Sequence, residues 1–154
     1  MVDILGVGVI VKGESGIGKS ECVLALVERG YSLVADDITK LKLIDGRVVI
    51  GTSAGVTRDH MEVRGIGIID VGAMFGVKSI RREKQLDLIV TLREWGDVDE
   101  VDRLGMEDET TEVLGVRVPH ITFRSVQGEI LHVWSRWLPF KINSSDRGII
   151  LLKN

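Results

Sequence analysis

VGVIVKGESGIGKS, residues 7–20, is the stretch that decides the fold. Residues 13–20 match G-x-x-x-x-G-K-[ST], the phosphate-binding pattern in which successive backbone N–H groups cradle phosphate oxygens. The apolar, β-branched run Val7–Val11 predicts a buried strand before the loop, and Glu21–Arg29 has the apolar spacing of a helix. A strand, a glycine-rich loop and a helix in this order predict a nucleotide-binding α/β domain.

The loop positions have separate chemical roles. Lys19 can reach the β- and γ-phosphates, and the hydroxyl of Ser20 can ligate Mg²⁺. The positive end of the following helix dipole favours the same anion. The predicted nucleotide-binding residues are Gly13, Glu14, Ser15, Gly16, Ile17, Gly18, Lys19 and Ser20.

The remaining pattern predicts an α/β fold with a mixed sheet. Lys40–Ile44 and Arg47–Ile50 flank Asp45-Gly46, a dipeptide typical of a hairpin turn. Strand-like runs also cover residues 62–70, 86–92, 113–118 and 121–123. Hairpins combined with strand–helix units indicate a sheet whose strands run in both directions.

Composition narrows the class of protein. The chain has 154 residues, 44% of them hydrophobic, which fits one globular domain. A net charge of −3 gives no reason to expect nucleic acid or an anionic membrane as partner. The single Cys22 can form no internal disulfide, and no apolar run could span a bilayer, so we expect a cytoplasmic protein. A solvated face is the favoured interpretation of the short basic cluster, with anion or partner binding as the alternative: Lys78, Arg81, Arg82 and Lys84.

Acidic residues at predicted strand ends are the candidates for metal binding and base catalysis. Asp36 and Asp37 directly follow a short apolar run, and α/β sheets bind ligands at the carboxyl ends of their strands. Glu62 begins the glycine-rich block EVRGIGIID, residues 62–70. A kinase needs one acidic group to hold the metal and another to accept the proton of the nucleophile.

One arginine is needed in many phosphoryl-transfer sites to stabilise the developing charge. Arg103 is a candidate, but its chemistry alone does not separate it from Arg58, Arg64 or Arg93. The residues around it, Asp102–Gly105, also fit the D-x-x-G pattern of GTPases. Because no Asn-Lys-x-Asp follows for guanine recognition, the GTPase interpretation is weak.

Four motifs in order carry a family resemblance. GVGVIVKGESGIGKSE, LVADD, EVRGIGIID and DRLGMEDE, within residues 3–122, resemble the catalytic domain of HPr kinase/phosphorylase. The resemblance implies a bacterial hexamer whose fold is related to phosphoenolpyruvate carboxykinase. It also implies a reaction: ATP and Mg²⁺ phosphorylate a regulatory serine of HPr, the phosphocarrier of the sugar phosphotransferase system. Phosphorolysis, with inorganic phosphate consumed and pyrophosphate formed, removes that phosphate again.

The same resemblance implies roles for individual residues. Lys19 and the loop backbone hold the nucleotide phosphates, while Ser20 and Glu62 hold Mg²⁺. Asp37 resembles the base that takes the proton from the HPr serine and returns a proton in the reverse reaction. Arg103 aligns with the catalytic arginine of the family.

Both ends of the chain depart from the family pattern. We expect the chain to begin inside the catalytic domain, so that an N-terminal domain and a functional histidine upstream of Met1 are missing. Residues 1–122 are then a partial catalytic domain, and residues 123–154 an aberrant tail. We hypothesise a frameshift, because one codon choice for residues 123–130 gives Ser-Val-Arg-Pro-Gly-Arg-Asn in another frame, close to a family loop.

Two other functions stay open at this point. A phosphate-binding loop of this kind also occurs in kinases for small molecules or for other proteins. A catalytically inactive nucleotide-binding fragment would keep affinity for ATP without transferring phosphate. Assays with HPr and with candidate metabolites distinguish these functions.

Overall fold

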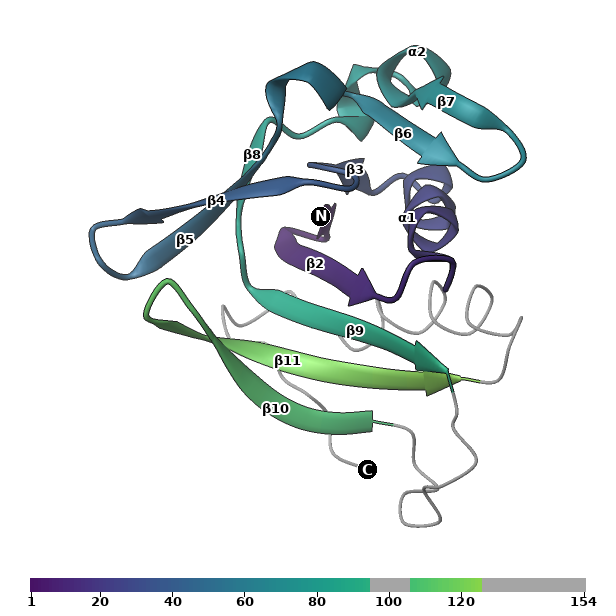
Figure 1. Cartoon of the computed structure of the whole chain (residues 1–154). Helices are drawn as coiled ribbons and strands as arrows, with labels where there is room; N and C mark the ends of the chain where they lie inside the picture. The colour runs from purple at the N-terminus through teal and green to yellow at the C-terminus, as the bar shows by residue number, and fades with distance from the viewer. Residues whose placement is uncertain (95–105, 126–154) are drawn as a thin grey trace.

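A mixed sheet forms the centre of the structure, a computed structural model that describes residues 1–94 and 106–125 (Figure 1). Within these residues its strand order is β10-β11-β9-β2-β1-β3. The neighbours β2, β9 and β11 are parallel, while the pairs β1–β2, β1–β3 and β10–β11 are antiparallel. The strands are β1 (Val2–Ile4), β2 (Val7–Gly13), β3 (Ser32–Leu33), β9 (Leu88–Glu94), β10 (Met106–Val113) and β11 (Val116–Ser125).

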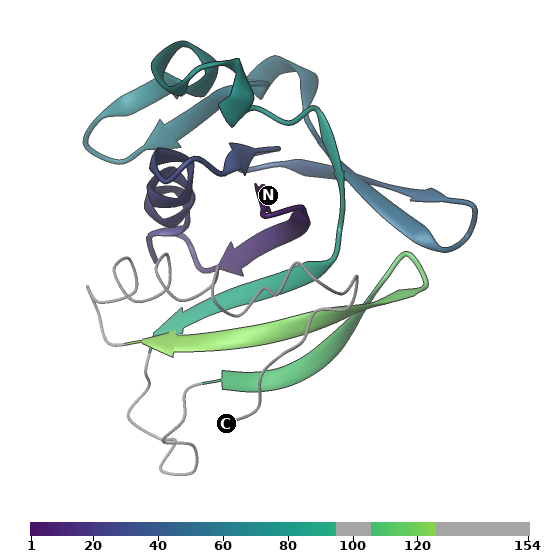
Figure 2. The ribbon, with the colours of Figure 1, turned by 180° about the vertical axis from the view of Figure 1, so that it is seen from behind.

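Helix α1 (Lys19–Glu28) covers one face of this sheet, as Figures 1 and 2 show from opposite sides. The side chains it buries lie three and four positions apart, which places them on one helix face: Cys22, Val23, Leu26 and Val27. They join a core that includes Val9 and Leu88 of the two central strands. The strand and helix predicted around the loop are therefore confirmed.

Smaller elements surround this unit. A second sheet has the order β4-β5-β8, and a third consists of β6 and β7. The short helices are α2 (Val71–Phe75), η1 (Gly55–Thr57) and η2 (Val77–Ser79). No helix among the described residues is long and apolar enough to cross a membrane. The remaining strands are β4 (Thr39–Ile44), β5 (Val48–Ser53), β6 (His60–Val63), β7 (Gly67–Asp70) and β8 (Glu83–Gln85).

Three predicted turns and strands can be compared directly with the structure. The hairpin at Asp45-Gly46 is confirmed, since β4 pairs with β5 from Ile44↔Val48 outward. The run 62–70 is wrong as one strand: β6 and β7 form a hairpin that reverses at residues 64–66. The run 113–118 is also split, because the chain turns at Leu114 and Gly115, both with positive φ.

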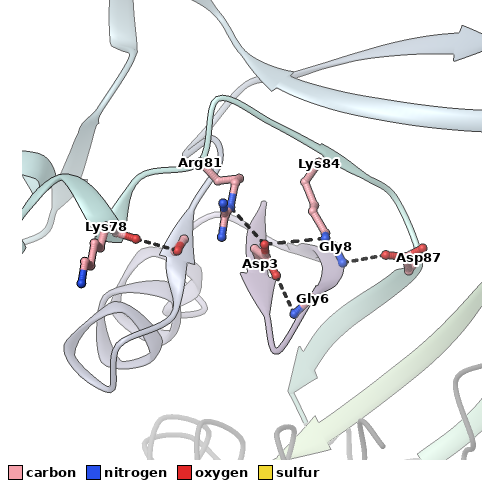
Figure 3. A network of polar contacts seen from close by, with 8 residues as sticks. Asp3, Gly6, Gly8, Lys78, Arg81, Lys84 and Asp87 are labelled. Atoms are coloured by element: carbon pink, nitrogen blue, oxygen red, sulfur yellow. Dashed lines mark hydrogen bonds and ion pairs between the residues drawn. The ribbon is translucent and has the colours of Figure 1, made fainter. Parts of the chain in front are cut away.

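Much of the basic cluster near residue 80 is tied to a buried carboxylate (Figure 3). Asp3 is 7% exposed and forms ion pairs with Arg81 (3.2 Å) and Lys84 (3.7 Å). It also accepts a hydrogen bond from the Gly6 N–H at 2.9 Å. A buried charge needs such partners, so these two basic side chains hold the segment before β9 against β1.

The thiol of Cys22 gives a test of this packing. Its side chain is fully buried in α1, and this burial, together with the charge of Glu21, raises the pKa of the thiol to about 12. Because the thiolate is the reactive form, we expect the folded protein to resist a thiol-specific disulfide reagent near pH 8. Denaturant should expose a thiol of ordinary pKa that reacts at once. Reaction of the folded protein at the rate of the unfolded one would contradict this packing.

Candidate active site

The loop between β2 and α1 is held in shape by its own lysine. The Nζ atom of Lys19 donates hydrogen bonds to the carbonyl oxygens of Gly13 (3.0 Å) and Glu14 (2.8 Å). Gly16 and Gly18 have φ values of 86° and 99°, a backbone conformation that residues with a Cβ atom rarely adopt. These bonds and turns close the loop around the N-terminus of α1, where the helix dipole favours an anion.

Asp36 joins the loop to the β6–β7 hairpin. One of its carboxylate oxygens accepts a hydrogen bond from the Ser20 hydroxyl at 3.4 Å, and the other accepts one from the Glu62 N–H at 3.0 Å. Burial raises the pKa of the Asp36 carboxyl, and the hydrogen bond from Glu62 opposes part of this rise. This residue therefore positions the beginning of α1 and strand β6 relative to one another.

The neighbouring Asp37 is in a different environment. Its side chain is exposed, and among the described residues it has no hydrogen bond or ion pair. It lines the same pocket as the loop, whereas the carboxylate of Asp36 is engaged on both oxygens. Of the two adjacent carboxylates, Asp37 is thus the one available to accept a proton from a bound group.

A pocket of about 290 Å³ brings most of the predicted site residues together. Its lining consists of Ser15, Gly16, Gly18, Lys19, Ser20, Glu21, Asp37, Glu62 and Arg64. Of the other predicted loop residues, Gly13 and Glu14 bind Lys19 through their carbonyls, and the side chain of Ile17 packs against the core. Arg103 lies outside the described residues, as does most of the predicted tail, although β11 continues to Ser125.

Arg64 is the site residue that sequence reasoning could not single out. It lies in the turn of the β6–β7 hairpin, and its guanidinium is close enough to the loop to meet a Cβ added at Gly16 at 3.3 Å. Among the described residues no carboxylate pairs with it. In the sequence, Arg64 differs from the other candidate arginines only in its place in the glycine-rich block that begins with Glu62. The pocket therefore has two cations, Lys19 and Arg64, facing the space above the loop.

The oxygen atoms around the pocket suit a hard divalent cation. In the described part of the chain, no three His, Cys, Asp or Glu side chains form a metal cluster by themselves. The Ser20 hydroxyl and the Glu62 carboxylate nevertheless line the pocket in which phosphate oxygens would supply further ligands. Magnesium in nucleotide sites is typically bound in this way, by one or two protein oxygens and the substrate phosphates. These residues fit the cation that the sequence predicts.

Comparison with known proteins gives a consistent result. Proteins named HPr kinase/phosphorylase from Geobacter sulfurreducens and Lachnoclostridium phytofermentans are 49% and 48% identical over 121 and 118 residues. The alignments cover 79% and 77% of this chain but 38% of each relative, so the chain spans well under half their length.

A solved structure and a family model agree with these relatives. The structure of the Hpr(Ser) kinase/phosphatase from Coxiella burnetii matches with a TM-score of 0.79 and 32% identity, covering 90% of this chain and 87% of that one. This match confirms the predicted α/β fold with a mixed sheet. The family model of the HPr serine kinase C-terminal domain matches residues 1–133. The chain belongs to the HPr serine kinase C-terminal domain family.

Proposed function

We propose that this protein transfers the γ-phosphoryl group of ATP to a regulatory serine of HPr, and removes it by phosphorolysis. One observation carries the proposal: a closed phosphate loop and an unpaired carboxylate, Asp37, line one pocket. The family and the names of its relatives supply the acceptor.

Lys19 and the backbone N–H groups of the loop bind the nucleotide phosphates in this proposal. Arg64 adds a second positive charge above Gly16, where it neutralises phosphate charge. Ser20 and Glu62 hold Mg²⁺, and Asp36 orients both through its two hydrogen bonds. A divalent cation held by these two residues would supply positive charge to offset the negative charge of the phosphates during transfer.

Asp37 is the proposed base. Its exposed carboxylate accepts the proton of the acceptor serine as that oxygen attacks the γ-phosphorus. In phosphorolysis the same group returns a proton to the serine oxygen while inorganic phosphate attacks and pyrophosphate forms. Arg103, placed by resemblance alone, is proposed to stabilise charge on the transferring group.

The decisive experiment is an assay with labelled ATP, Mg²⁺ and purified HPr. We expect phosphoserine on HPr with the wild-type chain, and a loss of at least about 10² in rate for Lys19→Ala, which removes a phosphate-binding cation. Lys42→Ala is the matched control, because Lys42 is exposed on the β4–β5 hairpin and does not line the pocket. Binding of ATP without transfer to HPr would favour an inactive fragment, and transfer to another acceptor would favour a different kinase.

The location of the protein in the cell, its partners and the origin of its C-terminal tail are part of the same proposal. We propose a cytoplasmic homo-oligomer that acts on a phosphocarrier, with no nucleic acid or membrane partner. Residues 123–154 are proposed to be the product of a frameshift, which sequencing of the gene would test. A family-like sequence in another frame after Thr122 is the expected result.

A further inference from the structure

One histidine links three strands of the main sheet through its side chain. His120 on β11 is half-buried, and its Nε2 atom lies 2.7 Å from the hydroxyl of Thr91 on β9. Its Nδ1 atom lies 2.7 Å from the hydroxyl of Thr111 on β10. Both distances are those of good hydrogen bonds, so the ring joins β11 to each of its two neighbours, which lie on either side of it in Figure 1.

The register of the strands explains how one ring reaches both hydroxyls. His120 lies opposite Ile89 on β9, and Thr91 is its diagonal neighbour two positions further along that strand. His120 lies opposite Glu109 on β10, where Thr111 is again two positions away. Alternate side chains share one face of a sheet, and a diagonal partner is within reach of a long side chain.

Thr111 connects this link to the reactive residues. Residues 111–114, at the end of β10 and in the turn after it, form one wall of a cleft of about 670 Å³. Lys19 and Asp37 line the same cleft, and both also line the phosphate pocket. In the described part of the chain β10 is the outermost strand of its sheet and pairs with β11 alone. The position of the wall relative to Asp37 therefore depends on how firmly the β10–β11 hairpin is held.

The ring links the strands best when it is neutral. A neutral imidazole has one nitrogen that donates and one that accepts, and a threonine hydroxyl can complete either bond. Protonation makes both nitrogens donors, so the hydroxyl hydrogen that pointed at the ring loses its acceptor. Charged groups near the ring come from three strands: Lys12 of β2, Arg93 of β9 and Glu109 of β10. Two cations against one anion also disfavour a positive charge on His120.

The pH range of the link follows from the same surroundings. Burial lowers the pKa of His120 from its ordinary value of 6.5; Glu109 opposes this shift, while Lys12 and Arg93 add to it. The unfolded chain therefore takes up the proton at a higher pH than the folded chain does. The stability that the neutral ring supplies is complete above about pH 6.5 and is lost progressively as the pH falls below that value.

We propose that His120 is a positioning residue for phosphate transfer: its neutral ring fastens the β10–β11 hairpin to β9 and so holds the wall of the cleft in place beside Asp37. The effect on transfer rests on the proposed function. A displacement of about an ångström in an active site lowers reaction rates strongly, so a loosened wall slows transfer although every reacting group is still present. Protonation of the ring at acid pH has the same consequence.

Thr111→Val breaks the link with little change of shape. Valine is β-branched like threonine and suits a strand equally well, but it offers the ring no hydroxyl. Thr110→Val is the matched control. Thr110 is exposed on the other face of β10, and among the described residues its hydroxyl has no hydrogen bond.

The rate of HPr phosphorylation by ATP separates the two variants. At pH 7.5 we expect the kcat of Thr111→Val to be about 2- to 10-fold below that of Thr110→Val, the factor that corresponds to one net hydrogen bond. The ratio of the two kcat values should approach one towards pH 5, where protonation weakens the link in the control as well. Titration of Asp36 and Asp37 affects both variants and cancels in this ratio. The KM for ATP should be unchanged, because no residue of the β10–β11 hairpin lines the phosphate pocket.

Hydrogen exchange tests the link without any activity. Protection of the β10 and β11 backbone amides, corrected for the intrinsic effect of pH on exchange, should fall in Thr110→Val between pH 7.5 and pH 5. In Thr111→Val this protection should already be about 2- to 10-fold lower at pH 7.5 and should change less with pH. The amides of β1, which the link does not contact, are the internal reference.

The outcomes distinguish this inference from the function on which it rests. If HPr is phosphorylated and the kcat ratio does not change with pH, the inference is wrong and the kinase stands. A higher KM for ATP with unchanged kcat would assign the hairpin to nucleotide binding and would also overturn the inference. Hairpin exchange that depends on Thr111 and on pH, in a chain that transfers no phosphate, would support the link and contradict the kinase. Identical hairpin exchange in the two variants would overturn the inference whether or not phosphate is transferred.

Discussion

Replacing Asp37 with asparagine is expected to slow phosphoryl transfer to HPr by about 10²–10⁴-fold, the usual contribution of a general base. Asparagine keeps the size and hydrogen-bonding reach of the side chain but cannot accept the serine proton. Because Asp37 lines the pocket without bonding to the loop, the affinity for ATP should stay within a factor of a few. The rates of both directions, measured with labelled ATP and with phosphorylated HPr plus inorganic phosphate, should fall together.

The control for this variant is Asp45→Asn. Asp45 lies at the exposed tip of the β4–β5 hairpin with φ 50°, a conformation that asparagine also adopts, so this change removes the same charge away from the pocket. Its rates should equal those of the wild type. If Asp37→Asn retained nearly full activity, the base would have to be another group, and Asp36 would be the nearest candidate.

Replacing Gly8 with alanine is expected to have the largest effect on stability. A Cβ at this position in β2 would lie 1.8 Å from the Gln85 carbonyl oxygen, far inside any possible contact. The backbone there is held to Asp87 by two hydrogen bonds, because the Gly8 N–H donates to the Asp87 carboxylate at 2.8 Å and the Gly8 carbonyl accepts from the Asp87 N–H at 2.9 Å. Relief of the clash therefore requires β2 to separate from the end of β8 and from Asp87, which follows it.

We expect Gly8→Ala to lower the free energy of unfolding by at least about 3 kcal/mol. For a chain of this size the midpoint of thermal unfolding should then fall by roughly 6–12 °C, measured by circular dichroism. Gly55→Ala is the control, because an added Cβ at Gly55 meets no atom within 4 Å, and its midpoint should change little. A Gly8→Ala protein as stable as the control would mean that β2 and the Gln85 carbonyl are not in contact.

Local chemistry explains why some elements could be predicted from the sequence. The phosphate loop depends on glycines and a lysine at fixed spacing, and the turn at Asp45-Gly46 depends on two residues that accept positive φ. The interpretation of residues 62–70 as one strand is wrong for the opposite reason. The apolar residues in this run suggest one continuous strand. The reversal between β6 and β7 depends instead on the backbone conformation of residues 64–66.

The arrangement of the site depended on contacts between distant segments. In the sequence Asp36 and Asp37 are adjacent and look equivalent. In the structure the Glu62 N–H and the Ser20 hydroxyl donate hydrogen bonds to Asp36 and not to Asp37. Arg64 became distinguishable from other arginines once the hairpin placed it over Gly16. Such long-range positioning has no periodic signal in the sequence, so these roles follow from the fold rather than from the motif.

The parallel pairing of β2 with β9 has a consequence for how the chain matures during synthesis. The loop after β2 leaves the ribosome before β9 does, so β2 gains its parallel partner, with Gly13 opposite Leu92, only when β9 has emerged. A contact between such distant segments also carries the entropy of closing a long loop. The nascent chain therefore carries the complete phosphate-loop sequence before it has the parallel strand that holds that loop in place.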